Sequence, residues 1–513
     1  MGAGGARSLP SSGALVLAIA ALTPLLQAAT WLRGDYGYFI DELYYLACAD
    51  HPALGYVDHP PLSIWVLSAV RAVLGSSVPA IRLVPALAAG AVVWLLCWMA
   101  RFMGGGRTAV VVTGIAATFA PLLLVIGSFH SMNILEVLSW VGMLAILLRL
   151  ASGHSPRLWL ALGAMAGLAF LNKHTVSTLL VGLAVATLLT PALRATLRTR
   201  WPWLAGLLAL GIALPNLVWQ LRHDWVSLEF YRQAHAQKNV VTPPLGVLKQ
   251  QLELLGPLSA PLWLTGAGWL WAARVARPFR PLVIVWSVLL TMLVLSQASR
   301  PDRIGGAALA LFPAGAVAVE RAAQRVRALR YAVPALRLAG GLPMVPFALS
   351  LLAPPRQAAY AAWLGLTPQL ERGRTSPLPQ WLADRTGWET YVDQVRAVVA
   401  TLGPEERAAA VIYVDSYGLA GALQRFAPDL PPVLCNHNSY WYWGRDWLAS
   451  HGDPRVVVGV LDSPDDLAPV GEPMIADRVR CAYCMSWRRD RPIVVVRAGG
   501  SLRPLWPRLR HLE

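Results

Sequence analysis

The sequence predicts a polytopic α-helical membrane protein with about eleven transmembrane helices and a C-terminal extracytoplasmic α/β domain. Of its 513 residues, 56% are hydrophobic and only 14% are charged, whereas a soluble protein of this length carries more charge. Apolar runs long enough to cross a bilayer recur through the first 353 residues. After that point the apolar runs shorten to strand length, at 410–414, 456–461 and 493–496. We therefore expect a transmembrane domain over 1–353 and a soluble domain over 354–513.

The apolar runs define the expected spans. The first of them has no clear small-residue cleavage site, so we interpret it as a retained helix and not as a removed signal peptide. The expected spans are 12–30, 79–100, 108–127, 133–149, 157–171, 175–191, 202–219, 257–273, 281–297, 304–320 and 332–353.

Arginine placement predicts the orientation of these spans. Five clusters of arginines fall in alternate connections, which identifies that side as cytoplasmic. With an odd number of spans, the C-terminal domain then lies outside the cell membrane. The clusters lie at 101–107, 149–157, 194–200, 274–280 and 321–330.

The net charge of +16 would also suit a nucleic-acid-binding protein. However, the basic residues punctuate apolar spans and do not gather on one soluble module, so membrane topology explains them better. We expect a lipid bilayer as a partner and no nucleic acid.

Acidic residues of the first domain gather on the predicted outer side, and only Glu320 falls on the cytoplasmic side. Five of them lie in one connection, residues 31–65, between two apolar stretches. Ionisable groups at a membrane boundary are costly and are usually functional. This outer loop is therefore the predicted catalytic face of a membrane enzyme.

Two parts of the loop carry the candidate chemistry. Asp41 and Glu42 form an adjacent acid pair, and a carboxylate in a low-dielectric setting has the raised pKa that suits a general base. An alternative role for the pair is to stabilise a helix N-terminus. Asp58 and His59 precede two prolines that fix the chain at the start of the next helix; a capped helix on the membrane surface is the alternative there.

These residues resemble a known family. Asp41-Glu42, an aromatic stretch and then Pro60-Pro61-Leu62 are similar to the first periplasmic loop of glycosyltransferase family 39, which includes protein O-mannosyltransferases and aminoarabinose transferases. The resemblance implies the GT-C fold and sugar transfer from a polyprenyl-phosphate donor to a protein, lipid or glycan acceptor. Further segments resemble bacterial members in the same order: 128–133, 171–174, 222–225, 228–230, 256–258, 261–264, 384–389 and 417–420.

The resemblance implies roles for individual residues. Asp41 is the catalytic base, with Glu42 beside it. His59 stands where many members have a lysine that contacts the lipid phosphate, and Asn133 stands where many have a second aspartate. The candidate substrate-binding residues are Tyr44, Tyr45, Asn133, His223 and Glu229.

Sugar transfer from a phosphate carrier also needs cations for the departing phosphate. The candidates on the outer side are Lys173, Arg300 and Arg303, with His59. Lys173 ends a short span and is expected inside the protein, although a snorkelling lysine is an alternative. The arginines at 300 and 303 alternatively form a local ion pair in an ordinary hairpin.

A divalent cation is the candidate cofactor, because carboxylates and histidines are potential ligands. The proposed ligands are Asp41, Asp58 and His223, with His235 as an alternative histidine.

Three other segments each leave two interpretations open. The polar segment 220–255 either covers the donor or lies on the membrane surface as an amphipathic helix. The aromatic segment 436–447 either stacks on sugars or packs against the membrane domain. Cys481 and Cys484 are either a structural disulfide or two free thiols.

The predicted function is a membrane glycosyltransferase that acts at the extracytoplasmic face of the cell membrane. The alternative is a transporter or flippase of envelope precursors, although transporters usually place ionisable residues at the membrane midplane within internal repeats. A scaffolding protein would leave the Asp41-Glu42 pair without a reason.

Overall fold

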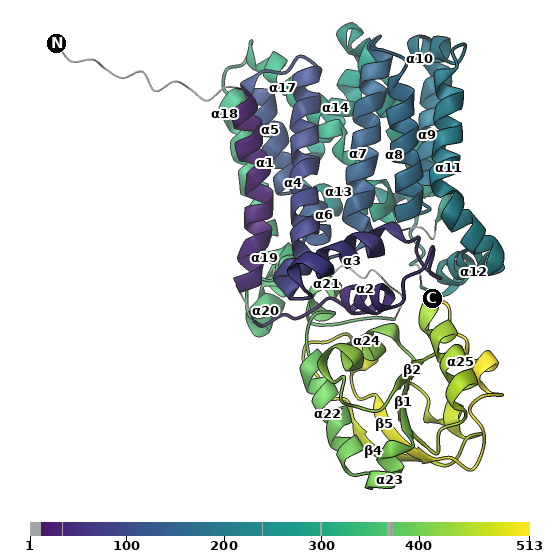
Figure 1. The fold of residues 1–513 in the computed structure, drawn as a ribbon. Helices are drawn as coiled ribbons and strands as arrows, with labels where there is room; N and C mark the ends of the chain where they lie inside the picture. The colour runs from purple at the N-terminus through teal and green to yellow at the C-terminus, as the bar shows by residue number, and fades with distance from the viewer. Residues whose placement is uncertain (1–11, 33, 239, 298–299, 367–370, 372) are drawn as a thin grey trace.

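The computed structural model describes residues 12–513 apart from 33, 239, 298–299, 367–370 and 372. It consists of a long helical bundle with a smaller α/β unit at one end (Figure 1). The helices of the first part are α1 (Ser12–Ala29), α2 (Ile40–Asp50), α3 (Leu62–Leu74), α4 (Val78–Phe102), α5 (Arg107–Thr118), α6 (Pro121–Ile126), α7 (Met132–Ala151), α8 (Leu158–Asn172), α9 (Val176–Leu189), α10 (Pro191–Thr196), α11 (Trp201–Arg222), α12 (Val226–Gln233), α13 (Pro244–Leu255), α14 (Ala260–Ala272), α15 (Pro281–Ser296), α16 (Gly305–Leu309), α17 (Leu311–Ala323), α18 (Leu329–Gly341), α19 (Met344–Ala348) and α20 (Pro354–Leu364).

Each of the eleven predicted spans contains a helix of the bundle. Within the described residues, four helices are long and apolar enough to cross a membrane by length and composition, at 78–102, 132–151, 201–222 and 302–323. Other spans are shorter or interrupted. The span predicted at 108–127, for example, divides into α5 and α6 because Pro121 cannot continue the first helix and instead begins the second.

Two short helices lie across one end of the bundle (Figure 1). The helix α2 lies between the bundle and the α/β unit, and α3 follows it. On α3, Ile64 and Leu67 are buried, while Trp65, Val73 and Leu74 are exposed. This loop region therefore presents α2 to the α/β unit and an apolar face of α3 to its surroundings.

The α/β unit is built on a five-stranded sheet in the order β2-β1-β3-β5-β4. The strands β2, β1 and β3 are parallel, and β5 runs antiparallel to both β3 and β4. The strands are β1 (Ala410–Val414), β2 (Val433–Cys435), β3 (Val456–Val460), β4 (Pro473–Arg478) and β5 (Pro492–Arg497), and the helices are α21 (Gln380–Ala383), α22 (Trp388–Ala400), α23 (Pro404–Ala408), α24 (Tyr417–Phe426) and α25 (Ser439–His451).

The three central strands, β1, β3 and β5, were predicted because they are valine-rich apolar runs, and their residues are buried except Arg497 at the end of β5. The two edge strands were missed. The strand β2 is apolar but has only three residues, and β4 is largely exposed and mixes polar with apolar residues. The expected covered α/β sheet is nevertheless present.

The α/β unit is attached to the bundle through a close contact between α2 and α24. A Cβ atom at Gly421 would lie 2.9 Å from the carbonyl of Leu43, and one at Gly418 would lie 2.4 Å from the Ile40 side chain. Glycine at both positions therefore lets α24 approach α2. This contact places Tyr417, the first residue of α24, beside the start of α2.

All five cysteines are free thiols in the structure. Cys481 and Cys484 lie in the loop between β4 and β5. Of the two open interpretations for this pair, the structure has the thiols.

Candidate active site

The start of α2 holds the predicted acid pair, and the structure gives its two members different roles. Glu42 has no exposed surface. Its carboxylate accepts hydrogen bonds from the guanidinium of Arg82 at 2.9 and 2.7 Å and from the backbone N–H groups of Phe39 and His130. Burial alone would raise the pKa of Glu42, but the Arg82 charge and these hydrogen bonds lower it. Glu42 is thus a fully paired anion that joins α2 to α4.

Asp41 is only half-buried and has few partners. Its Oδ1 accepts a hydrogen bond from the Tyr417 hydroxyl at 3.1 Å. Burial raises the pKa of Asp41 to about 6; Lys238 and Tyr417 oppose this rise, and the Asp58 charge adds to it. A carboxylate with this pKa is ionised at neutral pH and is basic enough to accept a proton.

An aromatic cluster lies behind Asp41. The Tyr44 hydroxyl donates to Asp58 at 2.8 Å, and its ring lies 4.8 Å from that of Tyr417. The His59 ring is completely buried and lies 4.6 Å from the ring of Tyr45. This burial encloses His59 among aromatic rings, so the structure does not present it as an open phosphate ligand.

Charged side chains from three segments surround Asp41. Lys238 lies 3.5 Å from Glu371, which also pairs with Arg374 at 2.7 Å. Arg300 donates two hydrogen bonds to Asp302, at 3.1 and 3.2 Å. The charge of Arg300 also interacts with Asp41. Arg300 therefore forms the local ion pair that was one of the two open interpretations, and its charge also acts on Asp41.

Lys173 lies farther into the bundle, between α8 and α9. Its ammonium donates to Asn133 at 2.8 Å and to Glu136 at 2.7 Å. The predicted cation and Asn133 are thus in direct contact. Lys173 and Arg303 both interact electrostatically with Asp302, which connects this group to Arg300.

The predicted residues His223 and Glu229 lie elsewhere. The His223 ring stacks on Trp219 at 4.0 Å and meets the edge of Tyr442. Glu229 pairs with Arg510 at 2.5 Å. Both residues therefore contact the α/β unit instead of Asp41.

The proposed metal ligands are not brought together. Asp41 and Asp58 accept hydrogen bonds from different tyrosines, and His223 is occupied with Trp219. Within the residues that the structure describes, no three His, Cys, Asp or Glu side chains form a group that could hold a metal ion.

Two buried residues of the α/β unit reach the bundle. Arg385 donates to the Ser128 hydroxyl at 2.6 Å, and burial lowers its pKa to about 9. Burial also raises the pKa of its neighbour Asp384 to about 7. The backbone N–H of Gly37 donates to the Arg385 carbonyl at 2.9 Å. This segment therefore closes the acid site from the side of the α/β unit.

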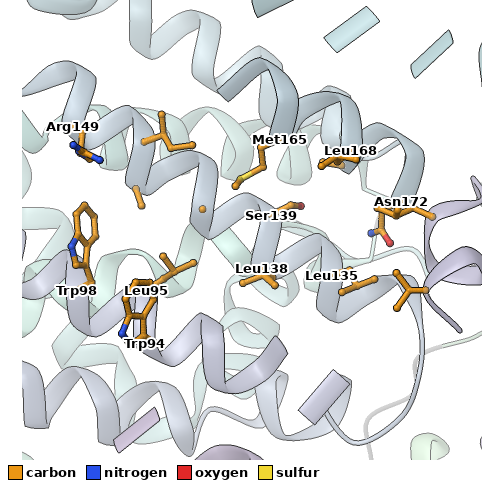
Figure 2. Close-up of a pocket in the computed structure, with 16 residues that line it drawn as sticks. Trp94, Leu95, Trp98, Leu135, Leu138, Ser139, Arg149, Met165, Leu168 and Asn172 are labelled. Atoms are coloured by element: carbon orange, nitrogen blue, oxygen red, sulfur yellow. The ribbon is translucent and has the colours of Figure 1, made fainter. Parts of the chain in front are cut away.

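An apolar groove of about 630 Å³ runs along the bundle between α4, α7 and α8. Figure 2 shows Asn172 at one end and Arg149 at the other, with Trp94 and Trp98 on one wall. Asn172 directly precedes Lys173. The groove therefore runs along most of α7, from Arg149 in the last turn of that helix to Asn172 beside the group of charged residues.

Sequence reasoning missed several site residues. Tyr417 and Asp384 lie in segments that resemble the family, but no role was assigned to them. Arg82 is a lone arginine within an apolar span, and that isolation is a usable signal for a buried ion pair. Lys238 and Glu371 have no local pattern, because only tertiary folding brings them to Asp41.

The helical bundle with its small sheet domain is the predicted GT-C fold. Residues 58–219 match the family model described as dolichyl-phosphate-mannose-protein mannosyltransferase. The structure superimposes on crystal structures of ArnT from Cupriavidus metallidurans. For the form bound to undecaprenyl phosphate, the TM-score is 0.61 at 18% identity, with 94% of this chain and 97% of that chain covered. The apo form gives a TM-score of 0.62.

A curated relative gives the sequence comparison. The chain is 28% identical over 298 residues to lipid A galacturonosyltransferase RgtD of Rhizobium johnstonii. That alignment covers 55% of this chain and 59% of the relative's own length. The predicted resemblance to family 39 glycosyltransferases is confirmed by these matches.

Proposed function

We propose that this protein transfers a sugar from a polyprenyl-phosphate donor to an acceptor hydroxyl at the extracytoplasmic face of the cell membrane, with Asp41 as the general base. The observation that carries the proposal is the half-buried Asp41 carboxylate, whose pKa is raised to about 6 and whose surroundings include Lys238 and Arg300. The chain is similar to RgtD, a lipid A galacturonosyltransferase, and to ArnT, whose structure was solved with bound undecaprenyl phosphate. Both similarities support a glycosyltransferase that uses a polyprenyl-phosphate donor.

The reaction follows from this arrangement. Asp41 accepts the proton of the acceptor hydroxyl while the acceptor oxygen forms a bond to the anomeric carbon of the sugar. The bond between that carbon and the phosphate oxygen breaks, and its electron pair stays with the phosphate. Cations beside the leaving group stabilise the charge that develops there. Arg300, Arg303 and Lys173 are our candidates for this role.

The apolar groove suits the polyprenyl chain of the donor. Its walls are almost entirely hydrocarbon and indole, and Trp94 and Leu168 on its rim are exposed. A chain that lies in the groove with its phosphate toward Asn172 would present the phosphate to Lys173. We therefore place the donor along α7 and the acceptor on the side of Tyr417.

The arginine clusters predict how the protein is oriented in the membrane. In Figure 1 the α/β unit lies at the end of the bundle opposite α10, whose last turn holds Arg194, the first residue of one arginine cluster. If the arginine-rich end is cytoplasmic, as the positive-inside rule predicts, Asp41 and the α/β unit lie outside.

A transfer assay in proteoliposomes with a labelled polyprenyl-phosphate sugar tests the proposal. We expect Asp41→Asn to lose nearly all transfer. Asp50→Asn is the matched control, because Asp50 lies at the other end of α2, has 60% of its side chain exposed and pairs with Arg71. Equal transfer by wild type and Asp41→Asn would refute the assigned base. Movement of the lipid across the bilayer without sugar transfer would favour a flippase.

A further inference from the structure

A chain of hydrogen bonds connects the outer loop to the charged residues near Lys173. The side-chain amide of Asn216, in α11, donates to the backbone carbonyl of Leu54 at 2.9 Å. The Asn216 side-chain oxygen lies 2.8 Å from Nε2 of His174, and the Tyr231 hydroxyl lies 2.9 Å from Nδ1 of the same ring. Four distant segments thus contribute one residue each: the outer loop, α11, the turn before α9, and α12.

The direction of each hydrogen bond in this chain is fixed. A backbone carbonyl only accepts, so the Asn216 amide nitrogen faces Leu54 and its side-chain oxygen faces His174. Burial lowers the pKa of His174, so its imidazole is neutral at neutral pH and has a single N–H. Because Nε2 faces the Asn216 oxygen, that N–H is on Nε2. Nδ1 is then an acceptor, and the Tyr231 hydroxyl donates its proton to it.

Packing holds the chain of hydrogen bonds in this arrangement. Asn216 has no exposed surface, although it lies in an apolar span. The rings of His174 and Tyr231 lie at 88° to each other, and Phe170 packs on the His174 ring at 4.7 Å. The helix α12, which carries Tyr231, lies at the end of the bundle near the α/β unit (Figure 1). The Tyr231 hydroxyl is therefore held in one place at the end where Asp41 lies.

The Tyr231 oxygen keeps its lone pairs as acceptors. Burial raises the pKa of Tyr231, so the hydroxyl keeps the proton that it donates to His174. The charges of Asp58, Arg303 and Glu136 all act on this hydroxyl. A guanidinium donates hydrogen bonds, whereas an ionised carboxylate only accepts them. Among these three groups, Arg303 is therefore the one that the Tyr231 oxygen can hold.

We propose that Tyr231 is a positioning residue that orients the Arg303 guanidinium toward the donor phosphate. Arg303 has a long side chain with many rotamers, and a fixed acceptor restricts the directions in which its N–H groups point. The N–H groups that remain form a planar fork, which matches two phosphate oxygens. His174 acts through Tyr231 by taking its proton, and Asn216 acts through His174. The proposal rests on the proposed transferase function and adds a residue to its donor-phosphate site.

Binding of a polyprenyl phosphate to the full-length protein in nanodiscs tests the proposal. The probes are undecaprenyl phosphate and the neutral alcohol undecaprenol, which share the chain and differ in the phosphate, and native mass spectrometry gives both affinities. We expect Tyr231→Phe to weaken binding of the phosphate about tenfold and to leave binding of the alcohol unchanged. Unchanged binding of the alcohol shows that the variant keeps its fold. In an Arg303→Met background, Tyr231→Phe should have little further effect, because the coupled pair is already broken.

Two variants of His174 test the direction of the hydrogen bond. His174→Asn keeps an acceptor oxygen on the side of Tyr231, so the affinity for the phosphate should stay within about threefold of the wild type. His174→Leu removes the acceptor, and the Tyr231 proton can then turn toward Arg303. The affinity of this variant should fall as far as that of Tyr231→Phe. Equal affinities of the two His174 variants contradict the assigned direction.

Tyr360→Phe is the matched control, since it also removes a hydroxyl that donates to a carbonyl oxygen, that of Pro343 at 2.8 Å. Its affinity for the phosphate should equal that of the wild type. A preference for the phosphate that Tyr231→Phe retains, or equal losses with and without Arg303, overturns the proposal. Such a result leaves the proposed function standing when the transfer assay still depends on Asp41. A wild type without any preference for the phosphate overturns the proposed donor as well.

Discussion

The hydroxyl of Tyr417 donates a hydrogen bond to Asp41 across 376 residues of sequence, at a distance of 3.1 Å. Tyr417 opens α24 of the α/β unit, and Asp41 opens α2 beneath the bundle. The candidate base therefore receives its hydrogen bond from a different part of the chain. Burial holds the pKa of Tyr417 well above its usual range, so its hydroxyl remains a donor.

Replacing Tyr417 with phenylalanine should shift the pH dependence of transfer. The hydrogen bond lowers the pKa of Asp41, and its loss raises that pKa by about one unit if the bond is worth about 1.5 kcal/mol. The acidic limb of the pH–rate profile should move to higher pH, and the transfer rate should recover above the new pKa. Tyr483→Phe, in a loop away from Asp41, is the control. An unchanged acidic limb in Tyr417→Phe would contradict the assigned contact.

The wild-type enzyme should lose activity as the pH falls through about 6. Because burial raises the pKa of Asp41 to about 6, the carboxylate is protonated below that value and cannot accept the acceptor proton. We expect kcat/KM to fall about tenfold per pH unit there. The residual rate of Asp41→Asn should lack this limb; its persistence would assign the titration to another group.

Glu42→Gln should damage the fold and not only the chemistry. The change leaves the Arg82 guanidinium buried without its charged partner, which costs about 3–5 kcal/mol. Thermal unfolding in detergent should occur at clearly lower temperature than for Asp41→Asn. The double variant Glu42→Gln with Arg82→Met removes both charges and should recover part of the loss. If Glu42→Gln were as stable as wild type but inactive, Glu42 would have a direct catalytic role.

Filling the apolar groove should discriminate between donors by chain length. Leu138→Trp adds bulk to the groove wall, so KM should rise several-fold for a long polyprenyl donor and little for a short one. Leu180→Trp, on an exposed face of α9 outside the groove, is the control. A uniform effect on both donors would show that the chain lies elsewhere.

Cys481 should be the most reactive of the five thiols under reducing conditions. A hydrogen bond from Cys484 is the main cause that lowers the pKa of Cys481 to about 6, whereas burial raises that of Cys435. Iodoacetamide at neutral pH should therefore label Cys481 first, as mapped by peptide mass spectrometry. Cys484→Ala removes the hydrogen bond and should slow the labelling. Faster labelling of Cys435 would contradict this order.

The fold was largely predictable because its signals are local. The apolar composition of a long run or of a valine-rich strand, such as β1 or β3, directly predicts that the segment is buried. The exposed strand β4 and the three-residue β2 give no such signal. The helix break at Pro121 was also missed, although the proline marks its position, because the spans were predicted from the length of each apolar run.

The candidate site was predictable only in part. Asp41 was found because it lies in a charged island within an apolar sequence. Its neighbours Tyr417, Lys238 and Glu371 come from distant segments, and their proximity depends on the docking of α24 on α2. His223 and Glu229 share a polar segment with Lys238, but folding directs them to Tyr442 and Arg510. The local sequence pattern therefore singled out Asp41 as a candidate, but it did not indicate which side chains lie around that carboxylate.

The groove between α4, α7 and α8 is open at its side, where Trp94 and Leu168 are exposed. A donor that occupies it arrives by lateral diffusion within the bilayer and not from water. Its effective concentration is then a mole fraction among lipids. Diluting the membrane with inert lipid should slow transfer even when the amounts of protein and donor per millilitre stay constant. The transfer rate should therefore be plotted against the mole fraction of donor in the membrane.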